Sequence, residues 1–172
     1  MVDPPAQTFF DALVAFLGHP SIVACESRRS LRRQTGSLLE EAFLALAVAS
    51  APDLSVEIGA HEASFSSRLK QRLPRVRALA FEANPYVFDR YTRGPDNRLS
   101  DVDYRNAAIC DTLGTVNLFI PTRWSKGTFD KANAISSLHR RNSLQFDYET
   151  VSVPSLTLDA AVEAIAFTNA VA

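Results

Sequence analysis

Glycine and paired cysteines are scarce in this sequence, and its charge has no dominant sign. The 172 residues include 6 glycines and 2 cysteines. Cys25 and Cys110 lie far apart and lack the CxxC spacing of redox or zinc motifs, so we expect reduced, buried thiols. The 18 basic and 19 acidic residues nearly cancel. The overall charge therefore favours neither nucleic acid nor an anionic membrane as a partner.

Long hydrophobic runs and export signals are also missing. The longest apolar stretch, "AFLALAVAS", is too short to span a bilayer and directly follows Glu40 and Glu41. The first ten residues, "MVDPPAQTFF", contain an acid and two prolines where a signal peptide needs basic charge and then an apolar run. A P-loop, zinc-ligand spacing and a serine nucleophile elbow are absent too. We therefore expect a soluble, cytoplasmic protein without a metal site.

The length and the 47% hydrophobic content suit one domain with a sizeable core. No repeat or low-complexity linker divides the chain. Residues 1–52 are predicted to be a helical N-terminal segment, and residues 53–172 an α/β domain. Within the first segment, "AQTFFDALVAFLG" has the apolar spacing of a short amphipathic helix that stops at Gly18.

A basic cluster and a second helix complete the N-terminal segment. The second helix, "SLLEEAFLALAVAS", is predicted to begin at Ser37 as its cap, with Glu40 at the capping-box position, and to end before Pro52. The basic cluster either forms a solvated helix face or contacts a phosphate or an acidic partner. It consists of Arg28, Arg29, Arg32 and Arg33.

From Asp53 onward, apolar strands alternate with amphipathic helices. The pattern reads as a strand "LSVEIG", a helix "HEASFSSRLKQRL", a strand "VRALAFE", a helix "NPYVFDRYTR" and a strand "VDYRNAAIC". Such alternation favours an α/β fold, with a doubly wound parallel sheet and helices on both faces.

The alternation of strands and helices stops after Gly114. "TVNLFIP" and "YETVSVPSLTLD" are predicted to form a hairpin or edge strands. Between them, residues 124–142 form a long polar stretch. Long loops at the edge of a site are often functional, so this stretch is either a lid that binds an acceptor or an ordinary solvated excursion.

Ligands of such sheets bind outside the carboxyl ends of the strands, where Glu57, Gly59 and Glu82 are predicted to lie. Gly59 permits a sharp turn and the close approach of a ligand, because no side chain intervenes. Glu82 ends the second strand about 20 residues later, the separation at which an acid accepts hydrogen bonds from ribose hydroxyls. The alternative for Glu82 is a helix-capping or surface carboxylate.

The loop after Gly59 indicates which cofactor suits this position. A dinucleotide needs G-x-G-x-x-G, because its pyrophosphate lies against bare backbone. Here Gly59 is followed by "AHEA", which has no second glycine and carries an acid that opposes pyrophosphate. S-adenosylmethionine has no phosphate, and its ammonium and sulfonium groups are attracted by an acid such as Glu57, while loop amides can bind its carboxylate. The loop therefore favours S-adenosylmethionine over NAD.

Four stretches also occur in an order that resembles a known family. They are "VEIGAHEASFS", "AFEANPYVFDRY", "NAAICDTLGTVNLFIP" and "VPSLTLD", and they span Val56 to Asp159. In this order they resemble the FkbM-type methyltransferases. The resemblance implies a Rossmann-like class I methyltransferase fold with a partly parallel sheet. It also implies methyl transfer from S-adenosylmethionine, usually to an oxygen of a sugar or other natural-product acceptor.

The resemblance assigns roles by position. Glu57, Gly59 and Ala60 would line the methionine end, and Glu82 would hold the ribose. The adenosine would be bordered by Asn84, Asn106 and Ala107. His61 is either a ligand contact, with a pKa that suits a general base, or a cap or surface residue. No catalytic base is assigned, because methyl transfer depends chiefly on placing donor and acceptor in line.

Two departures from the family pattern affect these expectations. The family has asparagine and glycine where this chain has His61 and Ala63, which makes the loop stiffer and bulkier. In the family, "TLD" also leads through a helix to a further parallel strand with "LKIDVEG"-like residues, whereas this chain ends at "AIAFTNAVA". We therefore expect the C-terminal strands to be missing, an exposed sheet edge and a possible homodimer. Asp159 is predicted to cap the last helix.

Two other functions remain open. One is a non-catalytic fragment or interaction module that keeps half a Rossmann sheet. The other is an NAD-dependent oxidoreductase, which the glycine count opposes. The favoured partner is a small hydroxylated acceptor such as a glycan, with no nucleic acid and no membrane.

Overall fold

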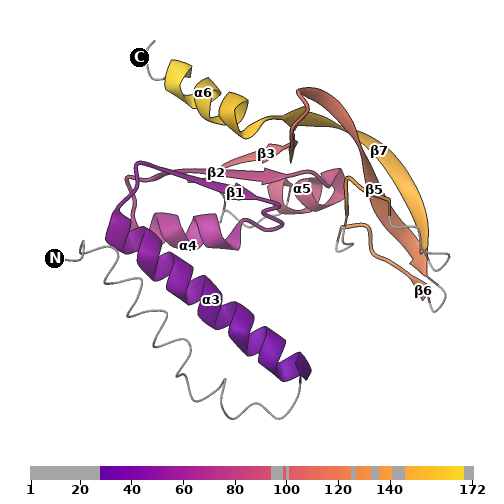
Figure 1. Cartoon of the computed structure of the whole chain (residues 1–172), viewed down its shortest axis with the longest axis horizontal. Coiled ribbons are helices and arrows are strands. Elements are labelled where there is room, and N and C mark those ends of the chain that lie inside the picture. The colour runs from indigo at the N-terminus through magenta and orange to yellow at the C-terminus, as the bar shows by residue number, and fades with distance from the viewer. Residues whose placement is uncertain are drawn as a thin grey trace.

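The chain folds as an α/β protein with two sheets and flanking helices (Figure 1). The computed structural model describes residues 28–93, 99, 101–124, 127–132, 136–140 and 146–168. The predicted first helix lies outside the described residues, and so does Cys25. No helix in the described ranges is long and apolar enough to cross a membrane.

Helix α3 (Arg28–Ser50) begins nine residues before the predicted start at Ser37. The prediction that Ser37 caps this helix is wrong: arginine is a good helix former, so the helix extends through the basic segment and Ser37 lies inside it. The side chains of the basic cluster lie outside what the structure describes. Ala51 ends the helix with a left-handed φ of 45°, and its N–H donates to Ala47 O at 3.1 Å.

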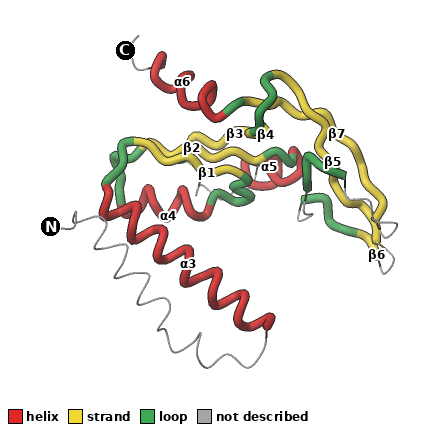
Figure 2. Tube along the Cα trace, viewed as in Figure 1, coloured by secondary structure: helices red, strands yellow, loops and turns green. Residues whose placement is uncertain are grey.

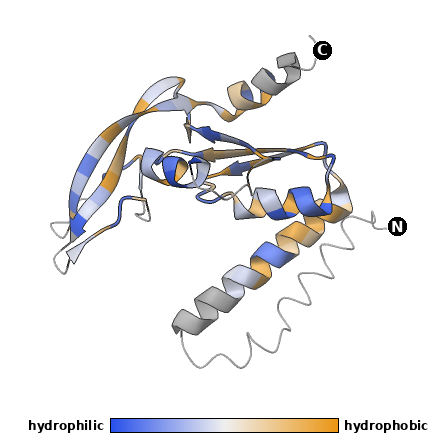
Figure 3. Ribbon diagram, turned by 180° about the vertical axis from the view of Figure 1, so that it is seen from behind, coloured by the Kyte–Doolittle hydropathy of each residue, from blue (hydrophilic) through white to orange (hydrophobic). Residues whose placement is uncertain are grey.

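The C-terminal half of α3 packs on the rest of the protein. Leu44 is buried there with Leu69 and Val76. This is also the hydrophobic half of the helix, and it lies beside α4 (Ser64–Arg72), as Figure 3 shows. Burial of this apolar face, rather than intrinsic propensity, supplies most of the stability of such a helix.

The first sheet contains three parallel strands in the order β1-β2-β3, namely β1 (Leu54–Ile58), β2 (Arg77–Glu82) and β3 (Asp103–Asn106). Helix α4 connects β1 to β2, and α5 (Pro85–Thr92) follows β2. The predicted alternation of strands and helices is confirmed here. It follows from the change of apolar spacing from strand to helix along the chain.

Helices lie on both faces of this sheet. On one face, Ala78 and Ala80 of β2 pack with Ala63, which directly precedes α4. On the other face, Leu79 and Phe81 pack with Ala161 of α6 (Leu158–Thr168). Because successive side chains of a strand point to opposite faces, one short apolar strand serves both layers.

The predicted single strand over residues 102–110 is instead two strands. β3 ends at Asn106, and β4 (Ala108–Ile109) pairs with the second sheet. The Asn106 Nδ2 donates to Glu82 O at 2.8 Å, where β2 ends. Because β2 ends here, it has no further backbone groups with which the next residues can pair, and the chain passes to the other sheet at Ala107.

The second sheet has the order β4-β7-β5-β6 and is mostly antiparallel. β5 (Gly114–Trp124) and β7 (Phe146–Leu156) form the predicted hairpin, and β6 (Gly127–Thr128) pairs with the end of β5. Figures 1 and 2 both show this hairpin curving away from the parallel sheet.

Two smaller predictions need correction. Thr157, not Asp159, caps α6, because Thr157 Oγ1 accepts from Ala160 N at 3.1 Å. Asp159 lies in the first turn, where its charge favours the helix dipole. Cys110 is free, as expected, but it is half-buried rather than buried, because it directly follows the short edge strand β4.

Candidate functional site

A cleft of about 350 Å³ lies where β1 and β2 end. Its walls come from the loop after β1, the end of β2, residues 107–109 and residues 136–138. This is the edge of a parallel sheet at which ligands are expected. Four of the eight predicted site residues line it: Gly59, His61, Glu82 and Ala107.

Gly59 turns the chain at the end of β1 with a left-handed φ of 69°. The N–H groups of Gly59 and Ala60 both donate to Phe81 O at 2.9 Å, which fixes the loop to β2. A Cβ on Gly59 would meet no atom within 4 Å. Glycine is therefore required here by the backbone conformation rather than by crowding. Ala60 is buried behind the loop and does not line the cleft.

Glu82 is the carboxylate at the floor of the cleft, and it is 7% exposed. Its Oε2 accepts from His61 N at 2.9 Å, and its Oε1 accepts from Asn84 N at 2.7 Å. Glu82 thus orders both the loop after β1 and the start of α5. Each carboxylate oxygen has a second lone pair, so both retain the capacity to accept from a ligand hydroxyl.

Asn84 and Asn106 hold the scaffold around the cleft, and neither is among the residues that line it. Asn84 is fully buried; its Oδ1 accepts from Tyr86 N at 3.0 Å to cap α5, and its Nδ2 donates to Lys131 O at 2.9 Å. Asn106 Nδ2 donates to the carbonyl of Glu82 at 2.8 Å and to that of Ala83 at 3.2 Å. Their amides are used within the protein, as buried polar groups usually are.

Glu57 lies on the α4 side of the sheet and does not line the cleft. Helix α4 begins after Ala63, which has no side chain that can cap. Glu57 Oε2 takes this role and accepts from Ser66 N at 2.9 Å. Burial raises the pKa of Glu57, while the hydrogen bonds from Ser66 act in the opposite direction. The sequence pattern did not indicate this capping role.

His61 and Ala63 have left-handed backbones, with φ of 50° and 49°. Asparagine and glycine adopt this conformation more readily than histidine and alanine. The exposed His61 ring packs edge-on against Tyr91 at 5.3 Å. The hydroxyl of Tyr104 donates to His61 O. Burial, and next the charge of Glu82, raise the pKa of Tyr104, so this donor stays protonated.

Residues 136–138 form another part of the cleft wall. They are held by a bridge to β5, in which Phe119 N donates to Ser137 O at 2.9 Å and Ser137 N to Phe119 O at 3.1 Å. They belong to the predicted polar stretch 124–142, for which a lid and a solvated excursion were both open. Part of that stretch therefore borders the cleft.

The cleft has an acidic rather than a basic character. Among the described residues that line it, none is lysine or arginine, and Glu82 carries the one carboxylate. A phosphate would meet no cationic side chain from these residues. A ligand with hydroxyl groups and a positive charge is better matched, because Glu82 accepts hydrogen bonds and attracts cations.

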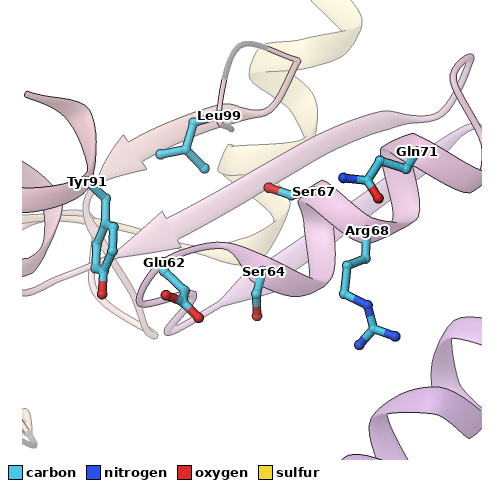
Figure 4. A pocket seen from close by; sticks show the side chains of 7 residues that line it. All are labelled: Glu62, Ser64, Ser67, Arg68, Gln71, Tyr91 and Leu99. Atoms are coloured by element: carbon cyan, nitrogen blue, oxygen red, sulfur yellow. The ribbon is translucent and has the colours of Figure 1, made fainter. Parts of the chain in front are cut away.

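A second pocket of about 290 Å³ runs along α4 (Figure 4). It is lined by side chains of α4 together with Glu62, Tyr91 and Leu99, and by none of the predicted site residues. Its arginine, Arg68, already pairs with Glu40 at 2.6 Å and with Glu41 on α3. The pocket adjoins the loop after β1 through Glu62, but none of the predicted site residues lines it, so we assign the candidate site to the cleft at Glu82.

Comparisons of this chain with protein-family models, with curated proteins and with solved structures gave no match. The geometry of the cleft therefore carries the functional argument.

Proposed function

We propose that this protein binds S-adenosylmethionine in the cleft and transfers its methyl group to a hydroxyl of a small, sugar-like acceptor. The observation that carries the proposal is Glu82, a buried carboxylate at the end of β2 that faces a cleft without lysine or arginine among its described lining residues. An acid at the end of the second strand is the usual acceptor for ribose hydroxyls in Rossmann-like sheets.

The character of the cleft favours this donor over NAD. Gly59 is followed by His61 and Ala63, so the loop lacks the bare backbone that pyrophosphate needs. The N–H groups of Gly59 and Ala60 are already bound to Phe81 O, so they are not available to a phosphate, nor to the carboxylate of S-adenosylmethionine that the loop amides were expected to bind. The sulfonium of S-adenosylmethionine instead gains from the charge of Glu82. The volume of about 350 Å³ is within the range of small-ligand sites.

The chain's own residues then have distinct roles. Glu82 accepts from the ribose hydroxyls, and Gly59 leaves space beside the strand end. Asn84, Asn106 and Glu57 act indirectly, because they hold α5, the end of β2 and α4. Residues 136–138 form the wall that would face an acceptor. Catalysis would come from holding donor and acceptor in line, a term that can supply about 7–11 kcal/mol.

The test compares ligands and then one substitution. Isothermal titration calorimetry should detect binding of S-adenosylhomocysteine and none of NAD. Glu82→Gln should weaken that binding by about 10- to 100-fold, because it removes a charge-assisted acceptor. Glu149→Gln is the matched control: Glu149 is also a partly buried acid with hydrogen-bonding partners, but it does not line the cleft. Binding of NAD alone, or equal binding by Glu82→Gln and the parent, would refute the proposal.

A second candidate is a module that binds the donor without turnover. The observation that favours it is the lack of proton acceptors: of the described residues that line the cleft, Glu82 and His61 alone have a carboxylate or an imidazole. Incubation with radiolabelled donor and a panel of hydroxylated acceptors separates the two candidates. Labelled product supports the methyltransferase, whereas donor binding without product supports the module.

A further inference from the structure

Strand β1 lies at the edge of the parallel sheet in the part of the chain that the structure describes. Among the described strands, it pairs with β2 alone. Arg77 N donates to Asp53 O and Gly59 N donates to Phe81 O, which shows that the backbone groups of Asp53 and Gly59 face β2. In a strand, alternate residues direct their backbone groups to opposite sides. The backbone groups that point away from β2 therefore belong to Leu54, Val56 and Ile58.

Among its described residues, this edge carries no lysine, proline or bulge, and its one charged side chain, Glu57, is bound to Ser66 N of α4. Protected edges have lysine, proline or a bulge, and β1 reads "LSVEI" with a regular register to β2. Ile58 is 53% exposed although it is apolar. The neighbouring α6 adds Leu158 and Val162, which are 45% and 37% exposed. The end of the strand and the helix thus both present exposed apolar side chains.

The strand and the helix belong to the same face. Leu54 and Val56 pack on the cluster that contains Ala161 of α6. Leu158 and Val162 lie three residues before and one residue after Ala161, so they flank this contact along the helix. Figure 1 shows α6 beside the parallel sheet, away from α3 and α4. A partner strand beside β1 would therefore also meet the exposed side of α6.

We propose that a second copy of this chain pairs with β1 across a two-fold axis at Val56. The two β1 strands run antiparallel, and Val56 lies opposite the partner's Val56. Leu54 then lies opposite the partner's Ile58, and Ser55 opposite the partner's Glu57. The two three-stranded parallel sheets become one six-stranded sheet.

The sequence of β1 is self-complementary in this register. Its alternation of apolar and polar residues reads the same from either end, so apolar side chains face apolar ones on the α6 side. Ser55 and Glu57 meet on the α4 side, where neither Glu57 lies directly opposite another carboxylate. The register also makes hydrogen-bonded pairs of all three residues whose backbone points outward. Such self-complementarity is what a two-fold interface requires.

The area requirement explains why the exposed apolar side chains matter. Stable interfaces bury about 1,200–2,000 Å² in total, more than two five-residue strands supply by themselves. Leu158 and Val162 of α6 provide additional apolar surface next to the strand pair. The dimer contact therefore includes both β1 and the outer side of α6.

A pair of cysteine substitutions tests the register directly. Both are made in the full chain with Cys25→Ser and Cys110→Ser, so that no native thiol reacts. Val56→Cys places two thiols opposite each other on the axis and should form a disulfide-linked dimer under mild oxidation. Ser55→Cys is the matched control: its thiol faces the partner's Glu57, so it should form at least about tenfold less linked dimer.

Sedimentation of the parent chain and two further variants tests the interface in solution. The parent should be a dimer at micromolar concentration. Val56→Pro keeps the ladder to β2, since the Val56 N–H points outward, but should weaken dimerisation by at least tenfold. Leu113→Lys changes an apolar residue that is 68% exposed elsewhere and should leave the dimer intact.

The outcomes separate cleanly, and none depends on binding of a methyl donor. A monomeric parent, whether its edge is bare or covered by its own chain, would overturn the proposal. So would a dimer that links equally through Ser55→Cys and Val56→Cys. If Val56→Pro does not fold, as circular dichroism would show, the cysteine pair still decides the register.

Discussion

The loop after β1 stores backbone strain that a matched pair of substitutions can measure. Ala60 and Ala63 are both buried alanines in one hydrophobic cluster, 5% and 0% exposed. They differ in backbone: Ala63 has a left-handed φ of 49°, and Ala60 is not among the residues with positive φ. Replacing each by glycine removes the same methyl group from the same environment. The difference between the two variants therefore reports the strain at Ala63.

The expected changes in the free energy of unfolding follow from three contributions. Loss of a buried methyl costs about 0.8 kcal/mol. The added freedom of glycine in the unfolded chain costs about 0.5–1 kcal/mol. Ala60→Gly should therefore lower the free energy of unfolding by about 1.3–1.8 kcal/mol. At Ala63, relief of a left-handed conformation returns about 1–2 kcal/mol, so Ala63→Gly should stay within about 0.8 kcal/mol of the parent.

Urea denaturation followed by far-UV circular dichroism measures both variants. Similar m values would show that the unfolded states are comparable. The two free energies of unfolding should differ by about 1–2 kcal/mol, with Ala63→Gly the more stable. Equal losses at the two positions would mean that the left-handed backbone of Ala63 carries no strain, and the reasoning would fail.

Three further predictions concern helix ends and charge. Ala51 is exposed with a φ of 45° at the end of α3, so Ala51→Gly should raise the free energy of unfolding by about 0.5–1 kcal/mol in urea denaturation. The pKa of Glu57 is raised above 4.5 in the fold, so the folded state holds its proton more tightly and the contribution of Glu57 to stability falls as pH rises above 4.5. Glu57→Gln, which keeps an oxygen for Ser66 N, should therefore gain stability relative to the parent between pH 4.5 and 7; no change in this difference with pH would contradict the assignment. Tyr86→Phe removes the O–H that donates to Glu149 at 2.8 Å and should cost about 0.5–1.5 kcal/mol at pH 7. Lys131 and then Tyr86 hold the pKa of Glu149 below 4.5, so the stability that Tyr86→Phe loses should become smaller below pH 4.5. Thermal denaturation at several pH values measures this loss of stability, and a loss that grows on acidification would refute the prediction.

Local patterns in the sequence predicted most of the elements, because apolar spacing reports which face of an element is buried. The predicted order from β1 to α5 is confirmed, and so is the hairpin of β5 and β7. The break at Ala107 was not predictable in this way. The break occurs because β2 ends beside Asn106 and because β7, almost 50 residues later in the chain, pairs with the next residues. Neither condition can be read from the local sequence.

The errors at the helix ends have a related cause. Ser37 has a capping side chain, but its N–H and its neighbours lie inside a longer helix, so no free group needs a cap. At α4 the situation is reversed, since Ala63 has no side chain that can cap and Glu57 reaches from another strand. Sequence shows which residues are able to cap, whereas the structure shows which backbone groups need one.

Half of the residues that the sequence assigned to the site do line the cleft, because the sequence placed a glycine and an acid at the ends of neighbouring strands. The sequence did not separate residues that face the cleft from those that support it. Glu57, Asn84 and Asn106 are polar and close to the strand ends, yet their side chains bind the backbone of other elements. Only the register of each strand and the path of the loop decide which polar groups remain for a ligand.

Because the chain passes between the two sheets at Ala107, ligand binding would affect the local unfolding of both sheets. The cleft has the parallel sheet on one side and the antiparallel sheet on the other, and the two sheets are hydrogen-bonded as separate ladders. Each ladder is therefore free to open as its own cooperative unit in hydrogen exchange. A ligand that lies between the two sheets binds only when both are formed. Its binding energy therefore makes the two sheets unfold together. Saturating ligand should slow amide exchange in β2 and β5 to a common rate, even for amides that lie far from the cleft.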